Sequence, residues 1–299
     1  MSSKKQITII GATGNIGSAV AKNLVNFGYE VKAIVRSLEK ANKLFCNEPH
    51  IKIEKADLNE ISGLKRALKG TEYLYLNLSS QSTKISTAFA PDREGVANIL
   101  EAIDENCIKQ IICISGLGAL DNVQNPDKFK FIPNILRKQG HKLIKESGIP
   151  YTILHCSWFI DSFVFYERNQ TYTVIGDTEN PIYFTNCLDF SNHIAYAVGN
   201  PDAFFKEFPV QGKDGYKHPE AAKMFFSVYN KSVKVNKLPS GIIGFLALFN
   251  KEFKMLKHMS DYFSKSIESF LAEEYGTYSI LGKPSNNLSD YALKLKNKI

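Results

Sequence analysis

Short apolar, β-branched runs alternate with longer amphipathic segments through the first half of the chain. The runs have the length of strands, and the segments between them carry the three- and four-residue apolar spacing of helices. This order is typical of right-handed βαβ units, so we predict an α/β fold with a doubly wound, Rossmann-type parallel sheet. The expected strands are Gln6–Ile10, Val31–Val35, Ile51–Glu54, Tyr73–Leu78, Ile108–Ser115 and Tyr151–His155.

Helical patterns separate these strands. The first helix is expected to begin near Asn15 and to end at Gly28, and later helices are expected around Arg93–Glu105 and Ile135–Glu146. The apolar stripe that the first helix turns toward the sheet consists of Ile16, Ala19, Val20, Leu24 and Phe27.

The alternation fades after about residue 156, where aromatic-rich segments begin. A further strand is expected near Phe208–Gln211, and a helix from His218. We therefore divide the chain into a Rossmann domain, residues 1–156, and a smaller C-terminal substrate lobe, residues 157–299. The late strand is expected to return to the sheet, which would interleave the two parts.

A glycine motif directly follows the first strand and opens the first helix. Gly11 is expected to allow the tight turn, Gly14 to leave room for phosphates, and Gly17 to let helix and strand pack closely. Free N–H groups at the helix start would then hold a pyrophosphate. The alternative is a purely structural turn. The predicted dinucleotide-binding residues of the motif are Gly11, Thr13, Gly14, Asn15, Ile16 and Gly17.

The end of the second strand indicates which dinucleotide is bound. NAD enzymes usually place an acidic residue there for the ribose 2′-OH, whereas this strand ends Val35-Arg36-Ser37. A guanidinium pairs with a 2′-phosphate, and a charge-assisted contact of about 1.5–3 kcal/mol would favour NADPH roughly ten- to a hundredfold. Ser37 and Lys40 are expected to assist. We predict NADP(H) rather than NAD(H); a merely solvated Arg36 is the alternative.

These features resemble the NmrA-like family of atypical short-chain dehydrogenases, in which the glycine motif is paired with "VR" after the second strand. The likeness runs nearly the whole chain: residues 145–154, KESGIPYTIL, closely resemble a family segment, and residues 188–195 resemble its "DxxDIA" turn, with His193 replacing the second Asp. The resemblance implies that further residues contribute to cofactor binding, namely Asp57 and Leu58 near the adenine and Asn77, Leu78 and Ser79 after the fourth strand.

The chain departs from the wider superfamily at its catalytic pair. Those enzymes use a Tyr whose pKa is lowered by a Lys four residues later, but none of the 14 tyrosines here has a Lys at that spacing. The corresponding places fall near Pro133 and Arg137. Since the same loss occurs among NmrA-like proteins, it fits the resemblance. It also favours acceptors that barely need a proton donor, such as quinones, flavins and enones.

Three residues are candidates for catalysis. Ser115 ends the fifth strand at the superfamily's serine position, with a backbone cap as the alternative. His141 lies on the helix before the sixth strand, where the resemblance implies polar groups facing the nicotinamide; an exposed helix residue is the alternative. Lys138, one turn earlier, could lower the pKa of His141 or bind substrate. Cys156, at the end of the sixth strand, is either a redox thiol or a small buried hydrophobe.

Composition narrows the function classes. Five cysteines without a C-x-x-C pair suit neither a disulfide framework nor a zinc site, and the six histidines show no metal-ligand spacing, so we predict no metal and a cytoplasmic location. The formal net charge of +7 comes from lysines scattered among acids, and no nucleic-acid-binding motif accompanies it. Nucleic acid is therefore not an expected partner.

The apolar run Ile242–Phe249 is too short to span a bilayer. It continues into a basic amphipathic segment that could lie on an anionic surface. Packing against the lobe, or against a second subunit in a homodimer, is the simpler expectation, so a membrane surface is not an expected partner.

Three functions fit these observations. The leading one is an NADPH-dependent oxidoreductase that passes hydride to a small apolar acceptor. The second, favoured by the missing Tyr–Lys pair, is a non-catalytic NADP(H) redox sensor that acts through a protein partner. The third is a sugar-nucleotide epimerase or dehydratase, against which the missing pair counts directly.

Overall fold

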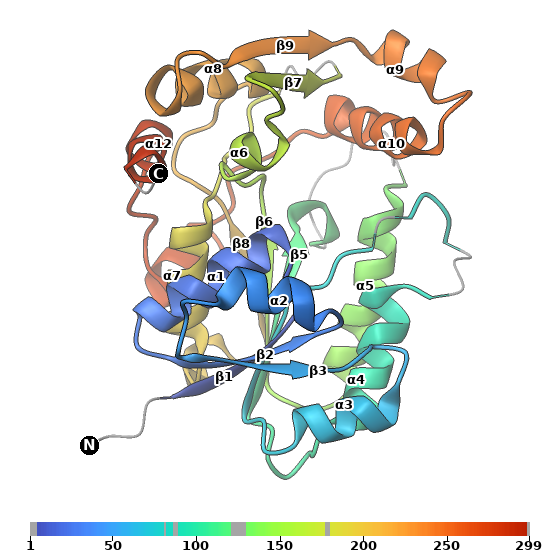
Figure 1. The fold of residues 1–299 in the computed structure, drawn as a ribbon, viewed down its shortest axis with the longest axis vertical. Helices are drawn as coiled ribbons and strands as arrows, with labels where there is room; N and C mark the ends of the chain where they lie inside the picture. The colour runs from blue at the N-terminus through green and yellow to red at the C-terminus, as the bar shows by residue number, and fades with distance from the viewer. Residues whose placement is uncertain (1–4, 81, 86–88, 121–129, 177–179, 298–299) are drawn as a thin grey trace.

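A seven-stranded parallel sheet is the centre of the larger part of the molecule (Figure 1). The computed structural model describes residues 5–80, 82–85, 89–120, 130–176 and 180–297. The strand order is β3-β2-β1-β4-β5-β6-β8. Strands β2 and β3 are added on one side of β1 and the later strands on the other side, as in a doubly wound Rossmann fold. The strands are β1 Gln6–Ile10, β2 Glu30–Val35, β3 Ile51–Lys55, β4 Tyr73–Leu76, β5 Gln110–Gly116, β6 Tyr151–Cys156 and β8 Lys206–Val210. The predicted fold class is confirmed.

Helices cover both faces of this sheet. One face carries α1 (Asn15–Asn26), α2 (Leu38–Phe45) and α7 (Cys187–Ala197). The other carries α3 (Ile61–Leu68), α4 (Val96–Ala102) and α5 (Ile132–Glu146). The strands are buried on both sides, which explains why they read as nearly continuous apolar runs in the sequence.

The predicted elements exist, with shifted ends. The helix expected over Arg93–Glu105 is a π-helical turn, Pro91–Gly95, continued by α4. It stops at Ala102 because Ile103 has an extended backbone. The fifth strand begins at Gln110 rather than Ile108, since the N–H of Ile108 is taken up by Asp104 in a turn.

The second half of the chain contributes to the sheet as well as to the lobe. The strand expected near Phe208–Gln211 is β8, which pairs in parallel with β6. The α7 helix packs on α1, where Asn23 Nδ2 donates to the Cys187 carbonyl at 3.3 Å and to Ser191 Oγ at 3.2 Å. Residues 187–210 are therefore part of the sheet domain, and the chain passes between the sheet domain and the smaller lobe several times.

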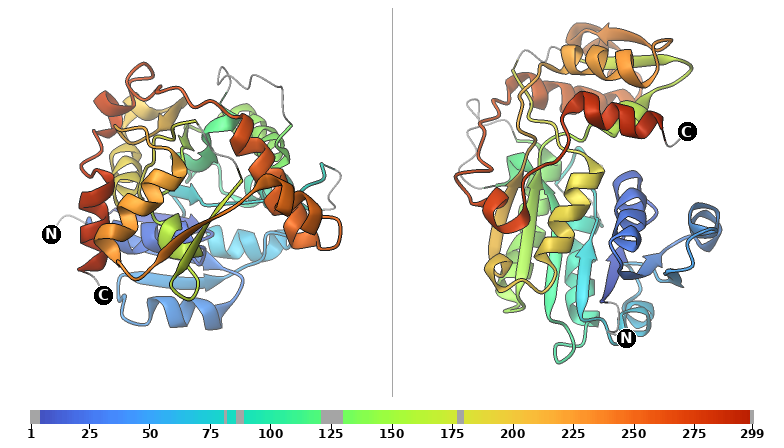
Figure 2. Two further views of the ribbon diagram at one scale, coloured as in Figure 1. Left: turned by 90° about the horizontal axis from the view of Figure 1, so that it is seen from above. Right: turned by 90° about the vertical axis from the view of Figure 1, so that its left-hand side faces the viewer.

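The smaller lobe sits on one end of the sheet domain (Figure 2). Its two-stranded parallel sheet has an aromatic core, which includes Phe163, Tyr172 and Phe225. Its elements are α6 Ser162–Tyr166, β7 Thr171–Ile175, α8 His218–Tyr229, β9 Lys234–Leu238, α9 Ser240–Leu246, α10 Lys251–Lys265 and α12 Leu288–Lys296; α11, Thr277–Leu281, lies against α7. Among the described residues, no helix is both long enough and apolar enough to cross a membrane.

Two glycines inside helices should respond in opposite ways to an added methyl group. A Cβ at Gly17 would lie 2.2 Å from the carbonyl oxygen of Gly11, whereas a Cβ at Gly63 meets only the movable end of Glu60, at 3.3 Å. We expect Gly17→Ala to lower the free energy of unfolding by about 1–3 kcal/mol. Gly63→Ala should raise it by up to about 1 kcal/mol through helix propensity.

Chemical denaturation of both variants beside the parent chain checks this pair. Equal denaturation midpoints for Gly17→Ala and the parent chain would show that the turn after β1 accommodates a Cβ without loss of stability.

Candidate functional site

The turn after β1 leaves the start of α1 open. Gly11 has a left-handed backbone, with φ at +87°, and a Cβ there would lie 2.2 Å from the carbonyl oxygen of Asn77. Gly14 precedes α1 in an extended conformation, and the first turn has neither a side-chain cap nor an acidic residue. The first N–H groups and the positive end of the helix dipole can therefore bind an anion.

Asn77 ties this turn to the next strand of the sheet. Its backbone N–H donates to the Ile10 carbonyl at 2.9 Å, and its Nδ2 donates to the Gly11 carbonyl at 3.4 Å. Its Oδ1 accepts from the buried Tyr75 hydroxyl at 2.9 Å. The turn is thus held from both sides. Of the other residues implied by the resemblance in this loop, Leu78 is buried and Ser79 is exposed.

Arg36 is exposed at the end of β2 and makes no ion pair or hydrogen bond with any residue that the structure describes. The hydroxyl of Ser37 caps α2 by accepting from the N–H of Lys40 at 3.2 Å, which leaves its proton available to an anion. After β3, Asp57 Oδ1 accepts from the N–H of Asn59 at 2.9 Å, and the Leu58 carbonyl accepts from Asn98 Nδ2.

The predicted cofactor residues therefore share one edge of the sheet. The turn after β1, Arg36 after β2, Asp57 after β3 and Asn77 after β4 all follow the carboxyl ends of neighbouring parallel strands. In doubly wound sheets this edge, at the reversal of strand order, is where ligands bind.

At the end of β5, Ser115 is buried, and its hydroxyl makes only a long contact of 3.5 Å to the Gly116 carbonyl. Arg137, at the place of the missing Lys, donates to Asn134 Oδ1 at 3.0 Å and lies 3.9 Å from the buried carboxylate of Asp92. A Cβ at Gly116 would be 3.0 Å from the Arg137 guanidinium. A cation therefore lies beside the carboxyl end of β5.

A phenol from the smaller lobe reaches the same place. The hydroxyl of Tyr262, on α10, accepts from Asn134 Nδ2 at 3.3 Å, and its ring stacks on Phe131 with a centroid distance of 4.4 Å. A Cβ at Gly118 would be 1.7 Å from the Tyr262 hydroxyl oxygen, so this oxygen lies against the chain just after β5. Burial raises the pKa of Tyr262, and the charge of Arg137 opposes that rise.

Sequence reasoning missed Tyr262. Its hydroxyl lies beside Asn134, the neighbour of Pro133, but it comes from a helix far along the chain. No spacing rule connects the two segments.

Comparison with known proteins now identifies the family. The model of the NAD(P)H-binding family matches residues 11–182, more than half of the chain. The chain belongs to this family, in its NmrA-like group of atypical short-chain dehydrogenases. The resemblance inferred from the glycine motif and the "VR" pair is confirmed.

Two curated relatives illustrate the range of this NmrA-like group. Photosystem II assembly factor Ycf39 of Trieres chinensis is 24% identical, over 96% of this chain and 92% of its own length. The NAD(P)H azoreductase of Xenophilus azovorans is also 24% identical, over 76% of this chain and 75% of its own length.

Solved structures share the fold. Citrobacter triphenylmethane reductase complexed with NADP(H) has a TM-score of 0.72 at 17% identity, covering 97% of this chain and 99% of its own. An NADPH-dependent quinone oxidoreductase of Escherichia coli, complexed with NADPH, has a TM-score of 0.69 at 20% identity with the same coverage. A variant of NmrA has a TM-score of 0.69 at 14% identity, covering 99% and 97%.

His141 lies deep in this NmrA-like domain, so the alternative of an exposed helix residue is wrong. It is only 4% exposed, and its ring meets that of His155 edge-on at a centroid distance of 5.4 Å. Burial, helped by His155, lowers the pKa of His141 to about 3. The cations acting on it include Lys145 and Arg137, whereas Lys138 is exposed. The catalytic roles of His141 and Lys138 remain predictions.

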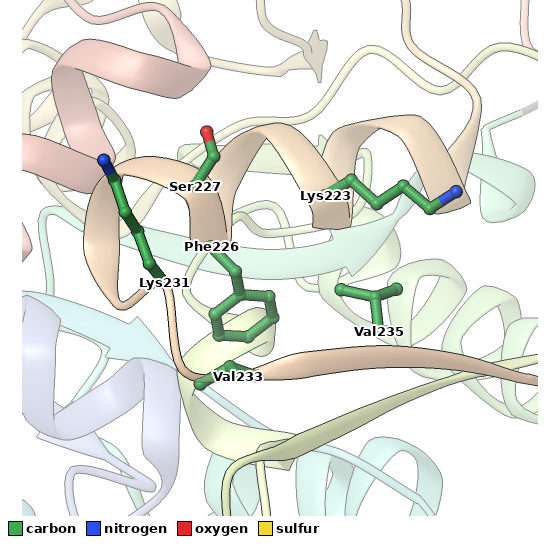
Figure 3. Close-up of a pocket in the computed structure, with 6 residues that line it drawn as sticks. All are labelled: Lys223, Phe226, Ser227, Lys231, Val233 and Val235. Carbon is green, nitrogen blue, oxygen red and sulfur yellow. The ribbon is translucent and has the colours of Figure 1, made fainter.

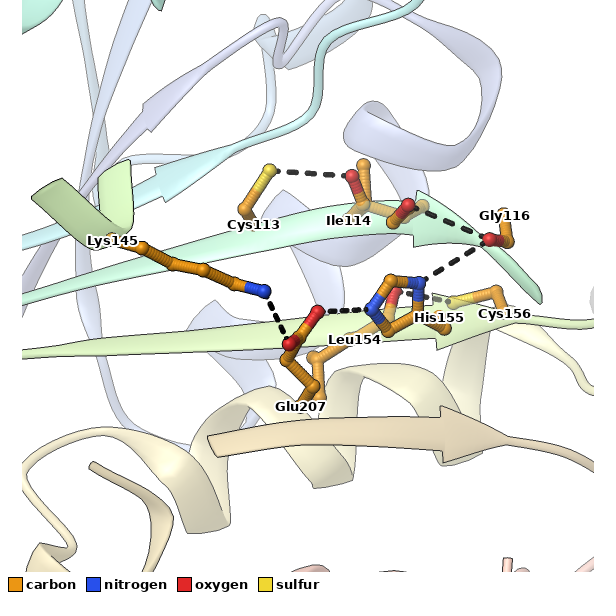
Figure 4. Close-up of polar contacts among 9 residues, drawn as sticks. Cys113, Ile114, Gly116, Lys145, Leu154, His155, Cys156 and Glu207 are labelled. Carbon is orange, nitrogen blue, oxygen red and sulfur yellow. Dashed lines mark hydrogen bonds and ion pairs between the residues drawn. The ribbon is translucent and has the colours of Figure 1, made fainter. Parts of the chain in front are cut away.

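The neighbours of His141 form an ion-pair network that joins α5, β6 and β8 (Figure 4). Glu207 accepts from Lys145 Nζ at 2.5 Å and lies 2.9 Å from His155 Nε2, while His155 Nδ1 lies 3.3 Å from the Gly116 carbonyl. Burial would raise the pKa of Glu207, but its bonds to His155 and Lys145 lower it to about 2. Nearby Cys156 is buried with a raised pKa, which supports its interpretation as a small hydrophobe.

One atom each of His141, His155 and Glu207 could coordinate a metal, since the three lie within 4.8 Å of one another. Their spacing along the chain gave no sign of this cluster. Its only carboxylate is already paired with Lys145, so a divalent ion would bring two uncompensated charges into a buried site. The absence of a metal remains our prediction on this ground.

Two surface depressions lie in the smaller lobe. One is bounded by α8 and β9 and lined by Lys223, Phe226, Ser227, Lys231, Val233 and Val235 (Figure 3). The second lies around Asp214 and Asn286. Neither includes a residue of the glycine turn, so the candidate site depends on the strand ends rather than on these depressions.

Acid should destabilise this chain through its buried histidines. Burial lowers the pKa of His141 to about 3 and the pKa values of His193 and His218 to about 4. The unfolded chain therefore binds more protons below about pH 6.5, and stability should fall from there toward pH 4. Each group adds a slope of about 1.4 kcal/mol per pH unit within its window.

Urea unfolding at a series of pH values measures this slope. His141→Gln should reduce it by about one proton. Parallel curves for the parent chain and His141→Gln would show that His141 is not a source of the acid sensitivity.

Proposed function

We propose that this protein is an NADPH-dependent reductase that passes hydride to a small, apolar, easily reduced acceptor such as a quinone, a flavin or an enone. The observation that carries the proposal is the exposed Arg36, which has no partner among the described residues, at the same sheet edge as the open start of α1. Support comes from similar proteins named as an azoreductase, a quinone oxidoreductase and a triphenylmethane reductase. Each name refers to an acceptor with conjugated bonds.

Two kinds of group would bind the cofactor: the backbone N–H groups of a helix start and a positively charged side chain. The first N–H groups of α1 would hold the pyrophosphate, because no side chain in the described part of the chain caps them. Arg36 would pair with the 2′-phosphate, helped by the free hydroxyl proton of Ser37. NAD(H) lacks that phosphate, and none of the residues 36–38 that directly follow β2 has a carboxylate to accept hydrogen bonds from its ribose.

When bound, NADPH supplies a hydride, which is two electrons and one proton, and becomes NADP⁺. Reduction of a quinone then needs one proton, which Tyr262 would donate to the acceptor oxygen and regain from water. Asn134 would hold the Tyr262 hydroxyl in place, and the charge of Arg137 would stabilise the phenolate. This pair would replace the Tyr and Lys of the wider superfamily, whose places near Pro133 and Arg137 cannot supply a phenol.

A second candidate function is a redox sensor that binds NADP(H) and acts through a protein partner. The absence of the Tyr-x-x-x-Lys pair favours it, as does the relative named as a photosystem II assembly factor. Both functions need the same cofactor site, so only a measurement of turnover distinguishes the reductase from the sensor.

Cofactor preference tests the role of Arg36. Equilibrium titrations with NADPH and NADH at one salt concentration should show a preference for NADPH of at least about tenfold. Arg36→Gln should raise the Kd for NADPH roughly ten- to a hundredfold and change the Kd for NADH little. Lys43→Gln, an exposed residue on α2, is the matched charge control and should keep the preference. Equal affinities of the parent chain for both dinucleotides would remove the phosphate assignment.

Turnover tests the role of Tyr262. In NADPH oxidation with a quinone and with an enone, Tyr262→Phe should lower kcat for the enone by about a hundredfold and for the quinone by less, with NADPH affinity unchanged. The phenylalanine keeps the ring that stacks on Phe131. Tyr196→Phe, at an exposed position on α7, is the control.

Unchanged kcat values in Tyr262→Phe would exclude it as the proton donor. Tight NADPH binding without turnover of any acceptor by the parent chain would favour the sensor.

A further inference from the structure

The α9 helix is apolar on two sides, but only one of them is packed. Ile243 and Ala247 are buried where α9 lies on α10. On the water-facing side of α9 and in the turn that follows it, Phe245 is 63% exposed, Leu248 72% and Phe249 77%. Surface helices normally turn polar residues toward water. An exposed apolar side such as this one is typical of a surface that binds a partner.

These exposed side chains form one patch, which we call the α9 patch: Ile242, Phe245, Leu248 and Phe249. The two phenylalanine rings lie 5.5 Å apart, centroid to centroid. Figure 1 shows α9 at the far end of the smaller lobe, after β9 and beside α10. The patch therefore stands at an extremity of the molecule, where a large flat partner can reach it.

Lysine-rich segments precede and follow the α9 patch along the chain. Residues 231–257 contain six lysines and one glutamate, a formal charge of +5 out of +7 for the whole chain. Lys231, Lys234 and Lys237 are exposed on or beside β9, and Lys254 is exposed on α10. Lys231 also borders the depression of Figure 3, together with Lys223. Residues 231–257 therefore carry most of the formal net charge of the chain.

We propose that the α9 patch docks this protein on an anionic lipid bilayer. The four apolar side chains would enter the boundary between headgroups and acyl chains, and the lysines of β9 and α10 would lie at the lipid phosphates. Apolar insertion and attraction to anionic lipid strengthen each other in such interfacial elements. A second copy fits less well, because pairing the two patches would bring two +5 segments together.

The test measures binding of the purified full-length chain to sedimenting vesicles. One set is phosphatidylcholine alone, and the other contains about 30 mol % phosphatidylserine. We expect binding to the anionic vesicles, weakened at about 1 M salt. Phe245→Ser combined with Phe249→Ser should lower the apparent affinity at least about tenfold. Lys234→Gln combined with Lys237→Gln should lower it by about fivefold per lysine.

Matched controls change the same residue types elsewhere. Leu293→Ser removes an exposed apolar side chain from α12, and Lys43→Gln combined with Lys65→Gln removes exposed charges from α2 and α3. Both controls should bind vesicles like the parent chain. Urea unfolding midpoints verify that every variant folds.

Three results would overturn the proposal. One is equal vesicle binding by the parent chain and the double serine variant. Another is absence of binding to the anionic vesicles. The third is a parent dimer that the double serine variant dissociates, which would make a second copy the occupant of the patch. The assay needs neither cofactor nor turnover, so its outcome is independent of the proposed reductase activity.

Discussion

The close approach of α1 to the turn after β1 is the constraint on which the rest of the structure depends. Gly11 and Gly17 have no side chains because the turn, the helix and Asn77 fill the space that a Cβ would need. Asn77 fixes this arrangement to β4, across the reversal of strand order. Once the helix start is held there, its N–H groups point to the sheet edge that also carries Arg36 and Asp57. One packing constraint therefore places the whole cofactor edge.

The second half of the chain is tied to that edge by two carboxylates that each accept several hydrogen bonds. Glu268, after α10, accepts from Ser157 after β6, from Gln211 after β8 and from the Tyr183 N–H. Asp161 accepts from Tyr291 of α12 at 2.6 Å and from the N–H of Cys187 at 2.8 Å. A buried carboxylate is tolerable only with such donors, so these bonds fix how the lobe meets the sheet domain. The same contact brings Tyr262 to Asn134.

Charged groups have different surroundings in two parts of the molecule. Between α5 and the sheet, Glu207 pairs with both Lys145 and His155. Burial keeps the neighbouring His141 uncharged, because it lowers the pKa of this ring. At the tip of the lobe, exposed apolar side chains lie between two lysine-rich stretches of the chain. The first arrangement closes a core and fixes the edge of the sheet. The second leaves a cluster of apolar side chains exposed to water, which is typical of a binding surface.

Sequence alone determined the features that are local along the chain. The strand and helix periods, the glycine motif and the "VR" after β2 each involve neighbouring residues, so they gave the fold, the family and the position of Arg36. Only the tertiary structure decided which distant groups meet. Tyr262 beside Asn134, Glu207 between His155 and Lys145, and the exposure of α9 all depend on how separate segments pack. Residue spacing carries no record of that packing, because long-range contacts are set by the whole buried core and not by any one stretch of chain.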